Sequence, residues 1–214
     1  MEIRIDLYYN KIDMHGGYDM KITDILDNWR QRGYIPHLCE NGEQAVHTAL
    51  QLIPAGSTIG IGGSMTVKQI GLEQQLAAHG CTVHGRVFGS TDPVPPTQWY
   101  ISSANAITER GDIVNIDGTA NRVSALIYGI PNILYVVGVN KICPDLDAAM
   151  DRARNIAAPL NAKRLNRNVP CAQSGVCTYC DAADCICNTT VIAHHPTRVQ
   201  KAVHILLIEE ELGL

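Results

Sequence analysis

The 214-residue sequence is poor in aromatic side chains, in positive charge and in long apolar runs. It has 8 Tyr, 2 Trp and 1 Phe, so aliphatic side chains must build most of any core. Its 17 Lys and Arg are outnumbered by 21 Asp and Glu, which argues against a general nucleic-acid binder, because such proteins carry a basic surplus. Hydrophobic residues still make up 46% of the chain, which is enough for a folded core and excludes intrinsic disorder.

The sequence also lacks a membrane-spanning run and a secretion signal. Its most apolar stretch, residues 125–139, contains Gly129, Pro131 and Asn132 and is shorter than the ~20 apolar residues of a membrane helix. Residues 1–7 alternate charged and apolar side chains, unlike a signal peptide. We therefore expect a cytoplasmic protein without a membrane partner, whose cysteines stay reduced.

Apolar periodicity predicts alternating helices and strands with short connections, which is typical of an α/β domain with a largely parallel sheet. We divide the chain into an N-terminal extension, residues 1–20, and one domain, residues 21–214, which includes a Cys-rich segment at 171–187. The pattern predicts helices at 22–33, 45–53, 67–78 and 145–165 and one beginning near 121, with strands at 34–39, 57–61, 81–87, 113–116, 132–138 and 203–208.

A glycine-rich loop, residues 60–66, lies between a predicted strand and a predicted helix. Glycine lets the backbone approach a ligand closely, and free N–H groups at a helix start favour an anion. The loop lacks the Gly-Lys-Ser/Thr ending of a P-loop and the third glycine of a dinucleotide fingerprint. We predict that Gly62, Gly63, Ser64 and Thr66 bind a small anion; the alternative is a tight turn with a helix N-cap at Ser64 or Thr66.

Residues 111–123 supply a second group of polar side chains. The predicted strand ends at Asp117 and the next helix begins near Asn121, followed by Arg122. Ligands of open α/β sheets bind at the carboxyl ends of the strands, so we expect these residues beside the glycine-rich loop, with Lys141 adding a charge. The alternative is a capping Asp-Gly turn with a surface arginine.

Five of the eight cysteines fall in the segment Cys171-x5-Cys177-x2-Cys180-x4-Cys185-x-Cys187. In a reducing compartment, thiolates from one short loop suit zinc or a four-iron cluster, and the spacing alone does not separate the two. Side chains alternate along an extended segment, so we expect only one of the last two cysteines to be a ligand.

The remaining cysteines and a run of basic residues have simpler interpretations. Cys39, Cys81 and Cys143 lie in apolar stretches and are expected to be small buried hydrophobes. The basic side chains in and after the predicted helix 145–165 are interpreted as a solvated face: Arg152, Arg154, Lys163, Arg164 and Arg167.

Taken in order, these motifs resemble the LUD domain family, named for lactate utilisation. The resemblance covers roughly residues 22–213, most of the chain. It rests on the stretches 52–56, 60–66, 103–108, 115–123, 136–141 and 185–188.

The resemblance implies a three-layer α/β/α fold, similar to the ribose-phosphate isomerase and CoA-transferase-like superfamily, whose glycine loop binds phosphate-bearing or acyl ligands. In bacterial lactate-utilisation operons, proteins with this domain accompany iron–sulfur subunits that oxidise L-lactate to pyruvate. No glutamate here matches a CoA-transferase nucleophile, so covalent CoA transfer is not supported. Cys185 stands where the resemblance leads us to expect another residue, so the choice between Cys185 and Cys187 as the fourth metal ligand stays open.

Our hypothesis is a protein that binds a small anionic metabolite and acts in the oxidation of L-lactate or another hydroxy acid. A [4Fe–4S] iron–sulfur cluster is favoured over zinc, and iron–sulfur electron-transfer subunits are the expected partners. The predicted metal ligands are Cys171, Cys177, Cys180 and Cys187. The predicted anion-binding residues are Gly62, Gly63, Ser64, Thr66, Asn105, Asn121 and Arg122, with Asp117 and Lys141 as catalytic candidates.

Two other functions stay open at this point. One is a non-redox enzyme acting on a sugar phosphate or an acyl-CoA, with Asp117 as acid or base and a structural zinc. The other is a metabolite-sensing protein without catalysis. The oligomeric state is also open, a homo-oligomer included.

Overall fold

A computed structural model describes residues 20–85 and 96–214. The predicted N-terminal extension, residues 1–20, therefore lies outside the described residues except for Met20. The end of the predicted strand 81–87 also falls outside them. Within these residues no helix has both the length and the apolar character that crossing a membrane requires.

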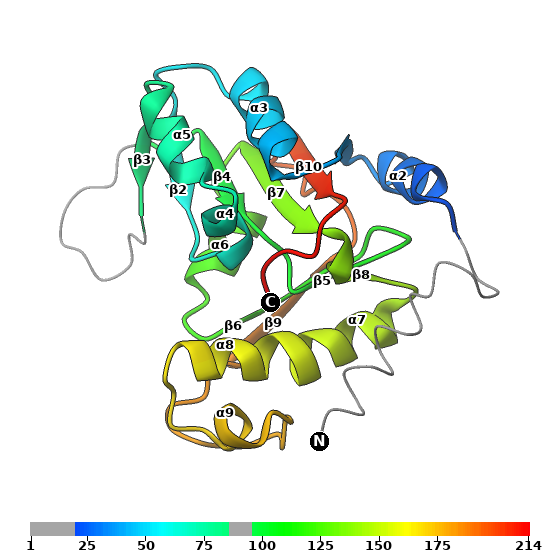
Figure 1. Cartoon of the computed structure of the whole chain (residues 1–214), viewed down its shortest axis with the longest axis vertical. Helices are drawn as coiled ribbons and strands as arrows, with labels where there is room; N and C mark the ends of the chain where they lie inside the picture. Colours follow the sequence, from blue (N-terminus) through cyan, green and yellow to red (C-terminus); the bar gives the residue numbers. More distant parts are fainter. Residues whose placement is uncertain (1–19, 86–95) are drawn as a thin grey trace.

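Six parallel strands form the larger sheet, sheet A, at the centre of the domain (Figure 1). Their order is β1 (Ile35–Cys39), β10 (Ala202–Ile208), β7 (Asn132–Gly138), β4 (Trp99–Ser102), β2 (Thr58–Ile61) and β3 (Thr82–His84). The two most apolar strands, β7 and β10, pair in the interior of the sheet, where helices cover both faces. The predicted parallel sheet is confirmed.

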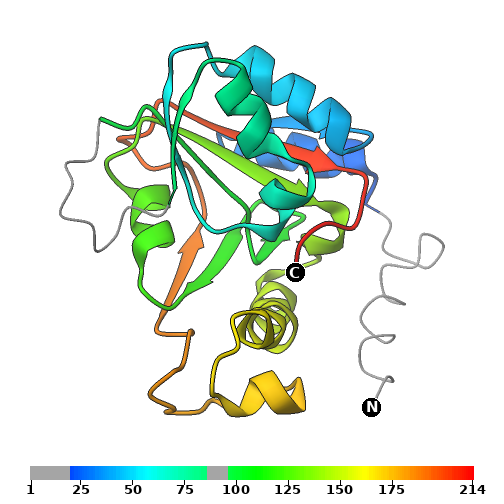
Figure 2. The same cartoon turned by 60° about the vertical axis from the view of Figure 1, so that its left-hand side comes forward.

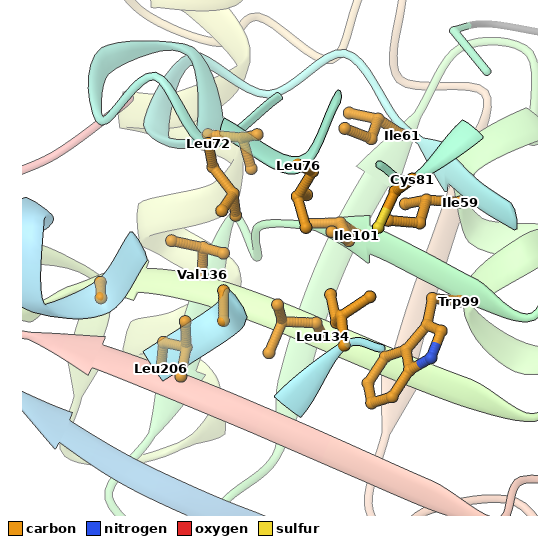
Figure 3. Packing of buried hydrophobic residues seen from close by; sticks show 14 of the residues in the cluster. Ile59, Ile61, Leu72, Leu76, Cys81, Trp99, Ile101, Leu134, Val136 and Leu206 are labelled. Carbon is orange, nitrogen blue, oxygen red and sulfur yellow. The ribbon is translucent and has the colours of Figure 1, made fainter. Parts of the chain in front are cut away.

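Alternate residues of the central strands point to opposite helical layers. Leu134 and Val136 of β7 pack against α3 (Gly42–Leu52), α4 (Met65–Gln69) and α5 (Leu72–Ala78), as Figure 3 shows for the neighbouring side chains. On the other face, Ile133, Tyr135 and Val137 pack against α2 (Ile22–Gln31) and α6 (Asn121–Ile127). This arrangement confirms the three-layer α/β/α fold.

A second, smaller sheet was not predicted. Sheet B has the order β8 (Ile142–Cys143), β5 (Ala106–Thr108), β6 (Ile113–Asp117) and β9 (Thr189–Ala193), and β6 runs antiparallel to both of its neighbours. The expectation that residues 113–117 join the main parallel sheet is therefore wrong. A short, fully buried apolar run reveals neither the direction nor the identity of its partner strands.

The predicted helix 67–78 is also wrong in one respect, because it is two helices. Gly71 between α4 and α5 has φ +66°, a left-handed conformation that interrupts the helix.

The predicted helix 145–165 forms as one long rod below sheet B (Figure 1). It consists of α7 (Leu146–Arg152), a π-helical turn η2 (Ala153–Ala157) and α8 (Ala158–Arg164), and it begins with Asp145 accepting from the backbone N–H of Ala148 at 2.8 Å. Pro159 has no N–H to donate, which accounts for the wider turn before it. The short helix α9 (Pro170–Ser174) lies beneath this rod, which Figure 2 views almost end-on.

A buried carboxylate ties sheet B to α2 and to the segment after β9. Asp112 accepts from Arg32 Nη1 at 2.5 Å and from Thr108 Oγ1 at 3.0 Å, and His194 Nδ1 lies 2.6 Å from the same carboxylate. Burial alone would raise the pKa of Asp112, but the hydrogen bonds from His194, Arg32 and Thr108 hold it below its usual value.

We predict that Asp112→Asn lowers the free energy of unfolding at pH 7 by about 2–4 kcal/mol, because Arg32 loses its buried partner. The depressed carboxyl pKa contributes stability that is present above about pH 4 and is lost as the pH falls below it. Urea denaturation of both proteins at pH 7 and pH 3 measures this, and the difference between them should shrink at pH 3. Asp27→Asn, which breaks an exposed pair with Arg30, is the control and should change stability by about 0.5 kcal/mol or less.

Candidate functional site

A cavity of about 500 Å³ lies where the carboxyl ends of sheet A meet sheet B and helix α8. The glycine-rich loop, the chain after β6 and the long helix contribute to its wall. All of the predicted anion-binding residues except Thr66 line it: Gly62, Gly63, Ser64, Asn105, Asn121 and Arg122. Asp117 and Lys141 line it too, so sequence motifs up to 80 residues apart meet in one place.

Lys141 is the central charged group of this cavity. It lies in the 3-10 turn η1 (Val139–Lys141) directly after β7 and is only 3% exposed. Its Nζ donates to Thr66 Oγ1 at 3.0 Å and to Ser103 Oγ at 2.9 Å. Thr66 is fully buried, which explains why it supports Lys141 from behind rather than lining the cavity.

The surroundings of Lys141 disfavour its positive charge. Burial is the main cause and the nearby guanidinium groups of Arg152 and Arg122 add to it, which together lower the pKa of Lys141 to about 7. Within the described part of the chain, Lys141 forms no ion pair with a carboxylate. Asp117 shares the cavity but pairs instead with Arg122, across 3.6 Å.

Arg122 is held by the protein itself. Its guanidinium donates to Asn115 Oδ1 at 2.5 Å, to the Ile116 carbonyl oxygen at 2.7 Å and to the Ser103 carbonyl oxygen at 3.5 Å. The predicted arginine is thus in the cavity wall, but most of its donors already have protein acceptors. Its positive charge still acts on the cavity because the side chain is buried.

Asp117 and Asn121 present polar atoms on the opposite wall. One carboxylate oxygen of Asp117 accepts from the Thr119 backbone N–H at 3.0 Å, whereas Oδ2 is buried without a hydrogen-bond donor. Asn121 begins α6 and accepts from the Thr119 hydroxyl at 2.6 Å. A buried carboxylate oxygen of this kind can accept a hydrogen bond from a ligand.

The glycine-rich loop combines a packing role with open space. A Cβ at Gly62 would lie 2.8 Å from the Tyr100 hydroxyl, so this position needs glycine for packing. Gly63 has nothing within 4 Å of such a Cβ, so a side chain there would extend into free volume. Ser64 caps α4 by accepting from the Val67 N–H at 3.3 Å, as the alternative interpretation of the loop expected.

Arg152 was missed by sequence reasoning, and its interpretation as part of a solvated face is wrong. It is 2% exposed and donates to the backbone carbonyl oxygens of Asn140, at 2.9 Å, and Asn105. A signal was present in the sequence, because Arg152 lies three residues after the buried Ala149, on the apolar side of the helix.

The segment after β10 borders the cavity through Leu214, a contact that no sequence motif predicted. Gly213 N donates to Gln69 Oε1 at 2.6 Å, and Arg152 Nη1 donates to the Leu214 oxygen at 3.3 Å. A Cβ on Gly213 would lie 2.8 Å from Lys141 Nζ, and its φ is +75°, so glycine is required at this contact.

The Cys-rich segment adjoins the same cavity. Ile186, between two of its cysteines, lines the cavity and packs on Gly118, where an added Cβ would lie 3.2 Å from Ile186 Cα. Asn188 Nδ2 fixes this contact by donating to the Gly118 carbonyl oxygen at 2.8 Å.

The thiols of this segment gather in one region. Burial raises the pKa of Cys171, and the neighbouring thiols of Cys180 and Cys177 raise it further. Burial likewise raises the pKa of Cys187, to about 12, with Cys185 as the next cause. As they stand, no three His, Cys, Asp or Glu side chains of residues 20–85 and 96–214 are arranged to hold a metal ion.

The three cysteines outside this segment are buried, as the sequence suggested. These are Cys39, Cys81 and Cys143, and all eight cysteines of the chain are free thiols. Their burial is consistent with a packing role.

We predict that Lys141→Met stabilises the fold, because the native state is penalised for burying this amine. The folded pKa of about 7 lies below the unfolded value near 10.4, so the unfolded state binds more protons and wild-type stability rises with pH across that window. At pH 6 the variant should gain on the order of 2–4 kcal/mol over wild type, and the difference should close toward pH 10.

Denaturant titrations from pH 6 to pH 10 test this, with the exposed Lys163→Met as the control that stays within about 0.5 kcal/mol of wild type. A Lys141→Met protein that is less stable at pH 6 would show that the amine is held for structural reasons.

Comparisons with known proteins identify the family of this chain. In the solved structures, a DUF162 family protein from Deinococcus radiodurans is similar with a TM-score of 0.50 and 12% identity, over 89% of this chain and 99% of that one. The tetrameric eIF2B-beta2-delta2 complex from C. thermophilum matches at TM-score 0.38 and 18% identity, over 50% of this chain and 45% of that one. The comparison with curated proteins gave no match.

The sequence model of the LUD domain matches residues 22–87 and 96–208, a span that includes the Cys-rich segment and the cavity residues other than Leu214. The resemblance seen in the sequence motifs is thereby confirmed: this chain belongs to the LUD domain family, the domain named for lactate utilisation.

Proposed function

We propose that the cavity binds a small hydroxy-acid or oxo-acid anion and that the protein acts in the utilisation of L-lactate or a related hydroxy acid. The observation that carries this proposal is Lys141, a buried amine of the cavity wall that contacts the Thr66 and Ser103 hydroxyls and, within residues 20–85 and 96–214, pairs with no carboxylate. A bound carboxylate would provide the missing counter-charge, which favours binding of an anion over a neutral ligand.

The remaining polar groups suit the rest of such a ligand. Asp117 lines the cavity, and its carboxylate is the kind of group that accepts a hydrogen bond from a 2-hydroxyl group. Space beside Gly63 admits the ligand carbon chain. Arg164 and Arg167 lie on the exposed side of the cavity wall, where positive charge attracts anions.

We further propose that the Cys-rich segment holds a metal centre, with an iron–sulfur cluster favoured over zinc. Soft thiolate donors suit either, and thiolates that raise one another's pKa are stabilised by a cation. Cys171, Cys177, Cys180 and Cys187 would hold the group; Cys185 Sγ, which accepts from the Cys187 N–H at 3.4 Å, is the competing fourth ligand. A four-iron cluster would supply one-electron transfer, and because oxidation of a hydroxy acid to an oxo acid removes two electrons, a further electron-accepting partner would be needed.

We predict that L-lactate and pyruvate bind the protein with an affinity that falls as the pH rises through about 7, because only protonated Lys141 attracts the carboxylate. Isothermal titration calorimetry between pH 6 and pH 9, in a buffer without small carboxylates or phosphate, measures this. The affinity for either anion should fall by about tenfold per pH unit above pH 7.

Two variants separate charge from space in this experiment. Lys141→Met should weaken lactate binding at pH 6 by about 1.5–3 kcal/mol through loss of a charged hydrogen bond. Gly63→Val should weaken it by filling the cavity, with unfolding unchanged. A lactate affinity that is the same in wild type and in both variants, and that does not change between pH 6 and pH 9, would show that the anion binds elsewhere.

We predict that anaerobically purified protein carries iron and sulfide and absorbs near 400 nm in the visible range, about four irons per chain. Elemental and sulfide analysis of wild type and of single Cys→Ser variants checks this. Cys39→Ser, outside the segment, is the control and should keep full metal content. A colourless protein with stoichiometric zinc would contradict the iron–sulfur assignment.

A further inference from the structure

We propose that Lys141 is a covalent catalytic residue, which forms a Schiff base with the carbonyl carbon of a small 2-oxo acid bound in the cavity. This inference rests on the proposed anion site and names a chemical class of substrate for it. It assigns to Lys141 a bond-forming role in addition to charge recognition.

The position of the amine differs from the usual structural placements of lysine. A structural lysine either extends its ammonium to water or pairs with a carboxylate. Lys141 does neither within the described residues, because it is 3% exposed and its two neighbours are the hydroxyls of Thr66 and Ser103. The amine is nevertheless at the wall of a cavity large enough for a small metabolite.

The charges around Lys141 favour the neutral amine, which is the nucleophilic form. Arg152 from α7 and Arg122 from α6 are the cationic groups that act on it, and Asp117 is engaged by Arg122. Burial and these two guanidiniums lower the lysine pKa to about 7, so a large fraction of the amine is unprotonated at neutral pH. Desolvation beside other cations is a recognised way to activate a lysine for carbonyl attack.

The charge of the cavity wall also biases which carbonyl compound would react. Basic side chains outnumber acidic ones there, with Lys68, Arg122, Lys141, Arg164 and Arg167 against Glu73 and Asp117, which favours an anionic substrate over a neutral aldehyde. A 2-oxo acid carries its carboxylate next to its carbonyl carbon, so one small molecule supplies both the counter-charge and the electrophile.

The step balances with no added oxidant or reductant. The neutral Nζ attacks the carbonyl carbon and one of its two protons passes to the carbonyl oxygen, which forms a carbinolamine. The second proton of Nζ then passes to the hydroxyl, which leaves as water, so that a C=N bond replaces C=O. The Ser103 hydroxyl, in the cavity wall and 2.9 Å from Nζ, is placed to pass these protons.

The experiment is trapping of the imine in the full-length protein. Pyruvate is added at pH 7.5, sodium borohydride reduces any imine, and intact mass spectrometry counts the adducts. We expect a single reduced pyruvate adduct per chain, located on the peptide that contains Lys141, where it also blocks trypsin cleavage after that residue. With pyruvate at saturating concentration at every pH, so that its weaker binding above pH 7 does not limit the reaction, the rate of trapping should rise with pH to half its maximum near pH 7, whereas surface lysines react near pH 10.

Variants and a second ligand separate the two proposals. Lys141→Met, checked for folding by circular dichroism, should lose the adduct, and the exposed Lys163→Met should keep it. An adduct that persists in Lys141→Met, or a rate that rises only toward pH 10, overturns the inference. L-lactate binding measured without any pyruvate adduct overturns the Schiff base alone, whereas loss of both binding and adduct overturns the anion site as well.

Discussion

The burial of one uncompensated cation is the physical constraint around which the site of this protein is organised. Lys141 Nζ is removed from water and receives two hydroxyl contacts in place of a carboxylate. Two arginines stand near enough to lower its pKa, and each is itself held in place by backbone carbonyl oxygens. Such an arrangement costs folding free energy, so it is expected where function rather than stability maintains it.

The fold explains how this charge is kept away from solvent. Lys141 and the glycine-rich loop lie at the carboxyl edge of sheet A, and Asp117 lies at the end of β6 in sheet B. The Ile116 N–H of β6 also donates to Asn105 Oδ1 and so fixes that side chain. The long helix then covers the region, because Arg152 on α7 binds the chain at Asn105 and Asn140. The segment after β10 also covers Lys141, because Gly213 lies against its Nζ. No single element could exclude water here by itself.

The contact between Gly118 and Ile186 joins the Cys-rich segment to the wall of the cavity. The chain that follows β6 provides cavity residues on one side and packs against the segment between two thiols on the other. A metal centre in that segment would therefore lie near a ligand in the cavity. This proximity is what makes a joint function of the two features, in the proposal for hydroxy-acid utilisation, physically reasonable.

Local sequence determined much of this protein. Apolar runs and their periodicity predicted the long helix and every strand of sheet A except β4, because burial on both faces of a sheet selects continuous apolar segments. Glycines, polar residues at strand ends and clustered thiols identified the parts of the site, and the motif order identified the LUD domain family.

Tertiary structure decided the rest. It placed β6 in a second sheet, antiparallel to both of its neighbours, and it buried Arg152 although its charge suggested a solvated face. It also surrounded Lys141 with arginines from separate helices and brought Gly213 against it. These features depend on distant segments packing together, and the pKa of a side chain is set by those neighbours and by desolvation rather than by adjacent residues in the chain.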